Sequence, residues 1–312
     1  MRYALPSWPL KIGTRGSPLA LAQAVETRVR LMRAWDWPDE AFEVVVIQTS
    51  GDRIQDRPLR LVGGKGLFTR EIEDQLLDGQ IDIAVHSMKD MPTAQPEGLV
   101  LDTFLPREDM RDAFVSQSAN SISSLTEGAR VGTSSLRRRA QLMHVRPDLD
   151  VVEFRGNVQT RLKKLTDGLA SATFLAMAGL NRLNMGHIAT VAIEPEHMLP
   201  AVAQGVIGIE RRSNDTKIAT LLEPLHDVST GLQLSCERAF LAALDGSCET
   251  PIAGLAVIEG SNLFLRGEVL RPDGSEKLSG QRLGPIANGA EMGHDLAKDL
   301  LSQADPEFFS WR

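Results

Sequence analysis

The chain has 312 residues, of which 42% are hydrophobic and only 5% aromatic, and its formal net charge is -7. This length predicts two or three domains, and the hydrophobic content is sufficient for several packed cores. The acidic balance gives no reason to expect nucleic acid or an acidic membrane as a partner, so we predict neither. Any anion-binding site must come from local clustering of Arg and Lys.

The localisation signals are simple. No run of about 18 apolar residues is present, so we expect no membrane span. The first ten residues contain Pro6 and Pro9 and lack the apolar core of a signal peptide, so we expect no export. Two cysteines, Cys236 and Cys248, cannot build a disulfide framework, which is typical of a reducing compartment. These features predict a cytoplasmic protein.

The first two thirds of the chain alternate between strand and helix patterns. Ser17 followed by Pro18 is typical of a helix N-cap and first helical position. The predicted elements are strands at 11–14, 42–49, 81–85, 151–154 and 173–177, and helices at 19–32, 69–77, 136–144 and 158–165. Such alternation predicts parallel sheets with helices on both faces.

Two further patterns concern domain organisation. Lys11–Thr14 and Arg130–Thr133 each open a strand–loop–helix unit with a Gly-Thr pair, which suggests two similar domains, although four matched positions leave coincidence open. The last third predicts a helix at 232–244, a three-stranded meander and a closing helix. The strands are expected at 252–258, 263–270 and 277–283, and the closing helix at 290–301. This order predicts a small α+β domain.

Polar residues gather where the predicted strands end, and ligands of open α/β sheets bind beyond the carboxyl ends of strands. The polar segments are 14–17, 50–52, 87–90, 133–135 and 155–157. The basic residues of the same regions are Arg15, Lys65, Lys89, Arg137, Arg138, Arg139, Arg155, Arg161 and Arg182. Arginine forks bind carboxylates or phosphates, so these regions predict a small polyanion as ligand. The alternative, a salt-bridged helix face, is favoured for Lys163 and Lys164.

Three candidates for chemistry stand out. Asp90 follows Lys89 at a strand end, where it could stabilise a developing cation, but spacing alone favours a turn cap. Cys248 lies in an accessible loop of small residues, whereas Cys236 lies within an apolar helix and is expected to be buried. The glycine-rich segment around Lys65 lacks the phosphate-loop spacing and is interpreted as a lid. The few histidines and cysteines form no zinc pattern, so we predict no metal.

Seven stretches together resemble the porphobilinogen deaminase family, from Lys11 to the final helix. They are 14–20 (TRGSPLA), 62–68 (VGGKGLF), 84–90 (AVHSMKD), 131–138 (VGTSSLRR), 155–158 (RGNV), 199–205 (LPAVAQG) and the loop around Cys248. The resemblance implies two α/β lobes like those of periplasmic binding proteins, with mixed sheets, helices on both faces and a cleft between the lobes. The implied domains are lobe 1 at 1–105, completed by 200–226, lobe 2 at 106–199, and a C-terminal α+β cofactor-attachment domain at 227–312.

The resemblance also implies an activity. The enzyme would be hydroxymethylbilane synthase, a transferase that deaminates four porphobilinogen molecules and joins them head-to-tail into hydroxymethylbilane. The growing chain would be attached to a dipyrromethane cofactor, built from two substrate units and held by a thioether at Cys248. Each porphobilinogen would lose ammonia to give an electrophilic azafulvene, which the growing chain attacks. Asp90 would be the catalytic residue, which binds the pyrrole N–H groups and stabilises positive charge on the ring.

The remaining site residues implied by the resemblance would mostly bind the acetate and propionate groups of the pyrroles. Those that bind the cofactor would be Lys89, Thr133, Ser135, Arg137, Arg138 and Arg155, together with Asp90. Those that bind substrate would be Arg15, Ser17, Arg155, Arg161, Arg182 and Gln204, and a mobile lid would contain Asp52, Lys65 and Phe68. Two positions depart from the family pattern: Leu61 replaces a Lys, with Arg60 beside it, and Ser247 replaces a Gly.

The resemblance implies a monomer that binds porphobilinogen and passes its product to a uroporphyrinogen-III synthase. Two other functions were considered. A non-catalytic, two-lobed small-anion binding protein has no use for Cys248 and would need a signal peptide. A transcription regulator that reads phosphates through Arg137–Arg139 is disfavoured by the acidic balance and by the lack of a helix-turn-helix pattern.

Overall fold

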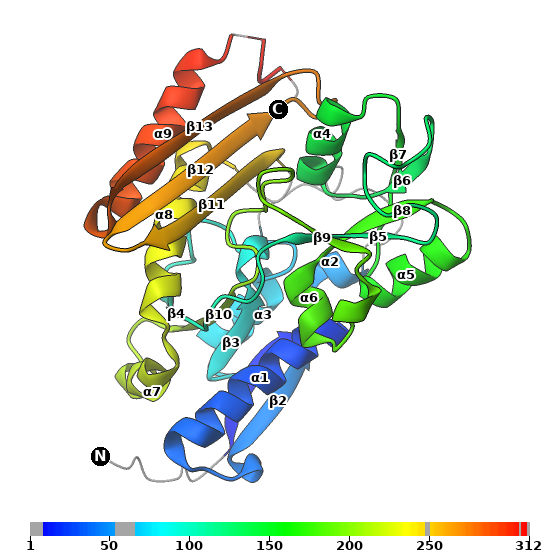
Figure 1. Ribbon diagram of the computed structural model, residues 1–312. Helices are drawn as coiled ribbons and strands as arrows, with labels where there is room; N and C mark the ends of the chain where they lie inside the picture. The colour runs from blue at the N-terminus through cyan, green and yellow to red at the C-terminus, as the bar shows by residue number, and fades with distance from the viewer. Residues whose placement is uncertain (1–8, 54–65, 247–249, 306, 311–312) are drawn as a thin grey trace. The chain divides into compact units, whose positions relative to one another are not determined.

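The computed structural model describes residues 9–53, 66–246, 250–305 and 307–310 (Figure 1). The chain divides into two compact units. Unit 1 comprises residues 1–107 and 206–231, and unit 2 comprises residues 108–205 and 232–312. The predicted bounds of lobe 1, residues 1–105 and 200–226, stay a prediction. The predicted division of the rest into a second lobe and a separate C-terminal domain stays a prediction, because both lie in unit 2.

Unit 1 contains a five-stranded mixed sheet in the order β2-β1-β3-β10-β4. Its strands are β1 (Leu10–Arg15), β2 (Phe42–Ile47), β3 (Ile83–Ser87), β4 (Leu99–Phe104) and β10 (Ile207–Arg212). Its helices are α1 (Pro18–Trp35), α2 (Ser50–Arg53), α3 (Arg70–Leu77) and α7 (Thr216–Leu222). The first three strands are parallel, and β10 runs antiparallel to both β3 and β4. Helix α1 begins as predicted, because the Ser17 hydroxyl accepts a hydrogen bond from the Ala20 N–H at 3.2 Å.

Both faces of this sheet are buried, each under its own core. Successive side chains of a strand point to opposite faces. Ile83 and Val85 of β3 therefore belong to the core that includes residues of α1 and α7, whereas Ala84 belongs to the core that includes Ile72 and Leu76 of α3. The predicted arrangement of helices on both faces is confirmed for this sheet.

Unit 2 contains a second five-stranded mixed sheet, in the order β7-β6-β8-β5-β9. Its strands are β5 (Asp112–Ser116), β6 (Arg130–Gly132), β7 (Asp150–Val152), β8 (Ala172–Ala176) and β9 (Val191–Ile193). Its helices are α4 (Leu136–Val145), α5 (Val158–Thr166) and α6 (Met177–Arg182). Strands β7, β6 and β8 are parallel, and β5 is antiparallel to its two neighbours. Phe114 and Phe174 lie in the core that includes Leu142 of α4, whereas Val115 and Leu175 lie in the core on the other face.

The two sheets have the same topology, which supports the suggested internal similarity. In each, the first strand of the repeated pattern lies between two parallel neighbours, and the fourth strand is antiparallel. Gly13 and Gly132 occupy equivalent positions in β1 and β6. A Cβ atom would lie 2.3 Å from an Ile81 side-chain atom at the first glycine and 2.3 Å from the Phe154 ring at the second. Each glycine therefore leaves space for a large apolar side chain.

The prediction of parallel sheets from chain alternation is wrong for one strand of each sheet, β10 in unit 1 and β5 in unit 2. Strands β4, β5, β9 and β10 were not predicted, and β10 and β5 run antiparallel to their neighbours. The alternation of strand and helix patterns indicates only how elements that are consecutive in sequence are arranged. Strand β10 pairs with β3 across more than 100 residues of intervening chain, and no local pattern records that pairing.

The C-terminal part of unit 2 is the α+β arrangement that the sequence predicts. Its elements are α8 (Val228–Ala243), whose first four residues belong to unit 1, and β11 (Ile252–Glu259), β12 (Asn262–Leu270), β13 (Lys277–Pro285) and α9 (Gly289–Gln303). The three strands form an antiparallel meander, and α9 packs against β12 and β13 (Figure 1). The 3₁₀ turns within the described residues are Asp39–Ala41, Met88–Asp90, Gly186–Ile188, Glu223–Leu225 and Ile286–Asn288. The predicted fold class is confirmed.

Close packing of α9 on α8 gives a first testable prediction. A Cβ atom at Gly293 would lie 2.4 Å from the Cys236 carbonyl oxygen and 2.8 Å from the Phe240 backbone nitrogen. Because backbone atoms cannot rotate away, Gly293→Ala should lower the free energy of unfolding by about 2–3 kcal/mol, despite the better helix propensity of Ala. Urea denaturation measures the loss.

Gly280→Ala is the matched control for this packing prediction. The nearest atom to its added Cβ would be Leu296 Cδ1 at 2.7 Å, the end of a flexible side chain. The control should therefore lose only about 1 kcal/mol. Equal losses in the two variants would contradict the packing argument.

Candidate active site

In unit 1, four predicted site residues lie at one edge of the sheet. Arg15 ends β1, Asp52 lies on α2 just after β2, and Lys89 and Asp90 form the turn after β3. These three strands are parallel neighbours, so their carboxyl ends meet at the same edge. The structure therefore brings these residues together, as the sequence predicts, and Ser17 begins the helix that follows β1.

Arg15 is held in place by two predicted lid residues. Its Nε donates to both carboxylate oxygens of Asp52, at 3.2 and 3.3 Å, and its guanidinium lies 4.2 Å from the centre of the Phe68 ring. Burial alone would raise the pKa of Asp52, but hydrogen bonding to Arg15, the Arg15 charge and Thr49 hold that pKa below its usual value. The Asp52 carboxylate is therefore ionised at neutral pH and orients Arg15.

The segment that carries Phe68 packs directly on α2. The Gly51 N–H donates to the Leu67 carbonyl at 2.8 Å, and a Cβ atom at Gly51 would lie 2.3 Å from the Phe68 ring. Only glycine fits at this contact. Lys65, the third predicted lid residue, lies outside the described residues, as do Arg60 and Leu61.

Asp90 occupies a well-anchored turn. Its strand is fixed by the Gln23 side chain, whose Nε2 donates to the Ser87 hydroxyl at 2.8 Å, and by the buried His86 and Glu210, whose side chains approach to 3.1 Å. The Asp90 side chain is half-buried and makes no hydrogen bond or ion pair with any described residue. The alternative role of turn cap requires a backbone N–H bound to this carboxylate, and the described chain offers none.

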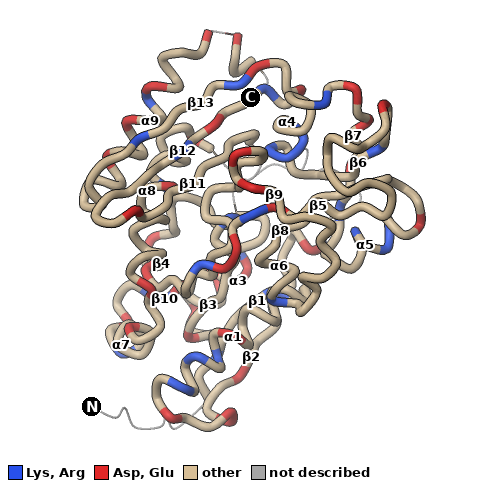
Figure 2. Tube along the Cα trace, viewed as in Figure 1, with Lys and Arg blue, Asp and Glu red and all other residues tan. Residues whose placement is uncertain are grey.

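In unit 2, the start of α4 carries the predicted hydroxyl ligands. The Ser135 hydroxyl caps the helix by accepting from the Arg138 N–H at 3.4 Å, and the Thr133 hydroxyl accepts from the Ser135 N–H at 3.2 Å. These contacts resemble the Ser17 cap in unit 1. The run Arg137–Arg139 follows at once and forms a continuous blue stretch on α4 in Figure 2.

Arg137 and Arg138 bind a buried carboxylate of the protein itself, which the sequence did not predict. Both side chains are buried, and each donates to Asp112 at 2.7 Å, Arg137 to Oδ2 and Arg138 to Oδ1. Gln204, expected near the substrate, donates to Asp112 Oδ1 at 2.9 Å and to the Met110 carbonyl at 2.8 Å. Much of the hydrogen-bonding capacity assigned to ligands is thus used within the protein. Asp112 was missed by the sequence analysis, because its partners lie far along the chain.

Asp112 is ionised in this environment. Its burial alone would raise its pKa, but the charges of Arg137 and Arg138 and the hydrogen bonds from Arg138 and Gln204 hold that pKa far below its usual value. The three side chains therefore carry a net single positive charge inside unit 2.

Arg155 lies in the loop before α5, and Arg161 lies within α5. Gly156 between β7 and α5 has a φ of +119°, and its carbonyl accepts from Arg161 Nε at 2.9 Å. The carbonyl of Arg155 accepts from Lys164 Nζ at 3.0 Å. Arg182, at the end of α6, donates to the Gly205 carbonyl at 3.1 Å. Each of these contacts involves a backbone carbonyl, which fixes the Arg161 and Arg182 side chains and the Arg155 backbone.

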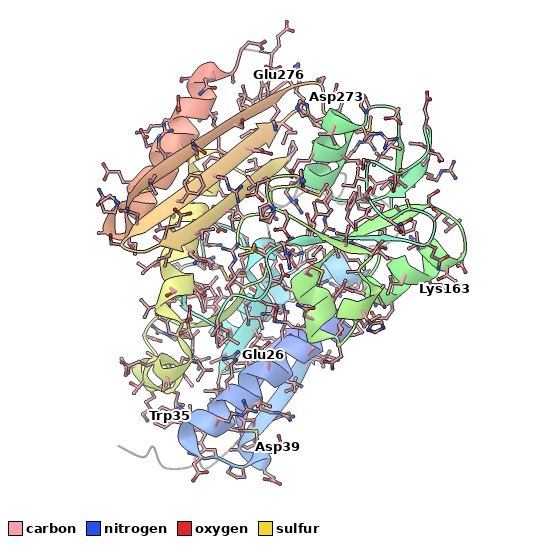
Figure 3. All side chains as sticks on the ribbon, viewed as in Figure 1. Glu26, Trp35, Asp39, Lys163, Asp273 and Glu276 are labelled. Carbon is pink, nitrogen blue, oxygen red and sulfur yellow. The ribbon has the colours of Figure 1, made fainter. Side chains whose placement is uncertain are left out.

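Three other basic residues of this region have structural contacts. Lys163 pairs with Asp167 on the exposed face of α5, as expected, and its position there is visible in Figure 3. The surface role expected for Lys164 is wrong, because its ammonium lies 5.6 Å from the centre of the Phe154 ring and binds the Arg155 carbonyl. Arg139 donates to the Val151 carbonyl at 2.9 Å.

The expected burial of Cys236 is confirmed. Cys236 is fully buried on α8, and burial, with the neighbouring Glu237 charge, raises the pKa of its thiol to about 12. A thiol with this pKa is protonated at neutral pH and is a poor nucleophile. Cys248 and Ser247 lie outside the described residues.

The donor set suits a carboxylate-rich cofactor. Arg137 Nε is buried and has no hydrogen-bond partner in the described chain, so an acceptor from a ligand would satisfy it. The hydroxyls and guanidinium groups nearby are also carboxylate donors. Within the described ranges, no three His, Cys, Asp or Glu side chains gather as metal ligands would, and no helix is both long and apolar enough to cross a membrane.

These features define an α/β protein with two mixed sheets and with basic side chains gathered at the strand ends of each. Residues 10–220 match the family model described as porphobilinogen deaminase, dipyromethane cofactor binding domain, and residues 232–302 match the porphobilinogen deaminase C-terminal domain. The porphobilinogen deaminase of Paracoccus denitrificans is 65% identical over 306 residues, which cover 98% of each chain. The chain belongs to the porphobilinogen deaminase family. It is a hydroxymethylbilane synthase, a transferase of tetrapyrrole biosynthesis that uses a dipyrromethane cofactor.

Solved structures give only slight similarity. A periplasmic substrate-binding protein of an ABC transporter from Coxiella burnetii is 14% identical, with 73% of this chain and 96% of that chain covered and a TM-score of 0.41. An arginine-specific periplasmic binding protein from Salmonella typhimurium is 13% identical, with 70% and 92% covered and a TM-score of 0.41. The family matches favour neither an anion receptor nor a transcription regulator.

Proposed function

We propose that this chain performs the family reaction with Cys248 as the thioether attachment point, Asp90 as the catalytic carboxylate and the strand-end cations as ligands of pyrrole carboxylates. The observation that carries this proposal is the Asp90 carboxylate, half-buried in an anchored turn and without a partner in the described chain. It lies at the sheet edge that also carries Arg15 and Lys89. Porphobilinogen is the substrate.

Asp90 acts on charge that develops during the reaction. Its carboxylate accepts hydrogen bonds from pyrrole N–H groups and stabilises the positive charge that appears on a ring. Because Ser87 and His86 fix the end of β3, the carboxylate needs little reorganisation when that charge develops. Such preorganisation is the main source of electrostatic catalysis.

The cations neutralise the acetate and propionate groups that every pyrrole ring carries. The bound dipyrromethane supplies the carbon nucleophile on which the chain grows. We assign Lys89, Thr133, Ser135, Arg137, Arg138 and Arg155 to the cofactor, and Arg15, Ser17, Arg155, Arg161, Arg182 and Gln204 to the substrate and growing chain. Asp52, Lys65 and Phe68 form the lid, in which Asp52 and Phe68 hold Arg15. Arginine suits these contacts because its fork binds a carboxylate through two parallel N–H groups.

The proposal extends to organisation and cellular context. The chain comprises two lobes and a separate C-terminal attachment domain, and it works as a cytoplasmic monomer. Its product is a linear tetrapyrrole that passes to a uroporphyrinogen-III synthase. Gel filtration of the holoenzyme tests the monomer, and a second copy in the eluted particle would overturn it.

The arginine assignments predict a dependence on chain length. Arg155→Lys should lower activity although the positive charge is kept, because Lys lacks the guanidinium fork. Different arginines meet different rings as the product grows, so the variant should accumulate a partly elongated complex, one to three substrate units heavier than the resting enzyme. Intact mass spectrometry after brief exposure to porphobilinogen detects these complexes.

Arg130→Lys is the matched control, because Arg130 is exposed and pairs with Asp150 on the surface of unit 2. It should give the wild-type set of complexes. If Arg155→Lys and an Arg161→Lys variant also gave the wild-type set, the arginine assignments would be wrong.

A further inference from the structure

One buried carboxylate connects several of the assigned ligands. Asp112, at the start of β5, is fully buried. Each of its two oxygens binds a different guanidinium: Oδ2 accepts from Arg137 Nη2 and Oδ1 from Arg138 Nη2, both at 2.7 Å. Without that carboxylate, two like charges would be buried side by side without the counterion that is hydrogen-bonded to both. Asp112 therefore makes this arginine pair electrostatically possible.

The other contacts of the pair fix its geometry. Arg137 Nη1 donates to the Leu199 carbonyl at 2.8 Å, and Arg138 Nη1 donates to the Phe174 carbonyl at 3.0 Å. Each planar guanidinium is thus held from two sides, so neither can rotate without breaking a buried hydrogen bond. The Gln204 amide binds Asp112 Oδ1 and the Met110 carbonyl, which fixes the carboxylate in turn.

This arrangement leaves one buried donor unsatisfied. Arg137 Nε has no hydrogen-bond partner in the described chain, although the Arg137 side chain is almost fully buried. Leaving a charged group's donor unpaired costs free energy, and natural structures seldom retain such a donor without a ligand or water to satisfy it. The donor is held in a fixed direction by the contacts to Asp112 and Leu199.

We propose that Asp112 is a positioning residue of the cofactor site: by binding both guanidinium groups, it orients Arg137 and Arg138 so that their remaining N–H donors meet a carboxylate of the dipyrromethane. The inference rests on the proposed function, which makes these arginines cofactor ligands. Asp112 itself touches neither cofactor nor substrate. It acts by fixing the two forks before the cofactor arrives, which reduces the ordering that binding requires.

The test measures cofactor capture rather than activity of the loaded enzyme. The cofactor-free fraction of each full-length variant is exposed to a series of porphobilinogen concentrations, and intact mass gives the fraction that acquires dipyrromethane. For Asp112→Asn, the porphobilinogen concentration at half-maximal capture should rise about tenfold, as is common when a group that orients a ligand is removed. Thermal unfolding, recorded in parallel, gives the folded fraction.

The shape of the capture curve separates positioning from simple destabilisation. A variant that is only less stable loses amplitude, because fewer molecules are folded, but its midpoint stays unchanged. Asp109→Asn is the matched control, since Asp109 belongs to the same segment and pairs with the partly exposed Arg111. That control should capture cofactor at the wild-type midpoint. A folded Asp112→Asn variant with the wild-type midpoint would overturn the proposal.

If Asp112→Asn does not fold, the capture midpoint of Asp112→Glu tests the proposal instead. Glu keeps the charge that balances the two arginines but moves the carboxylate by one methylene, so the midpoint should still rise severalfold; an unchanged midpoint would overturn the proposal. Arg155→Gln separates this inference from the proposed function. A normal midpoint for Arg155→Gln as well would reject the assigned cofactor site itself, whereas a raised midpoint for Arg155→Gln alone would reject only the role of Asp112.

Discussion

Replacing Cys248 by Ala is expected to give a folded protein that carries no covalent cofactor and makes no hydroxymethylbilane. The thioether requires a sulfur atom that is accessible as a thiolate. Cys236 cannot substitute, because its thiol is fully buried and burial raises its pKa to about 12. Intact mass before and after exposure to porphobilinogen shows whether the variant gains the cofactor, and circular dichroism verifies the fold.

Cys236→Ala is the control for the Cys248 experiment. Removing a small buried side chain should cost about 1 kcal/mol of stability, and cofactor content and most activity should be retained. Normal bilane synthesis by the Cys248→Ala protein would reject the attachment point. Loss of cofactor in the Cys236 variant would instead move the attachment to α8, against its burial.

Removal of the Asp90 carboxylate is expected to reduce turnover by at least about 100-fold, the loss typical of a preorganised group that faces developing charge. Stability should change little, since the carboxylate is half-buried and binds no partner in the described chain. Asp90→Asn keeps the shape and removes the charge. Steady-state turnover, thermal unfolding and intact mass are measured on the same preparation, so that loss of cofactor and loss of catalysis are counted separately.

Asp102→Asn is the control for Asp90, because Asp102 is another carboxylate of unit 1 and pairs with Arg211 at the surface. Its turnover should stay near the wild-type value. Turnover close to wild type in the Asp90→Asn enzyme with normal cofactor content would show that the charge is dispensable. A large fall in melting temperature would indicate that Asp90 is mainly structural.

The sequence by itself determined the elements whose causes are local. Ser17 and Pro18 predicted the start of α1. The Ser17 hydroxyl caps this helix by accepting a hydrogen bond from the N–H of Ala20, only three residues later. Periodicity predicted most of the helices and the C-terminal meander, because it reports which side chains along one element are buried together. The strand-end residues Arg15 and Asp90 were also predictable, since parallel strands bring consecutive loops to one edge.

The tertiary structure alone decided the contacts between distant segments. Asp112 binds arginines 25 and 26 residues later, and no spacing along the chain signals a buried carboxylate that balances two charges. Strand β10 pairs with β3 although residues 108–205 of unit 2 separate the two strands along the chain. This antiparallel pairing makes the sheet of unit 1 mixed rather than parallel. Lys164 turned inward for the same reason, because its partners, a carbonyl and an aromatic ring, become neighbours only when α5 packs beside the loop before it.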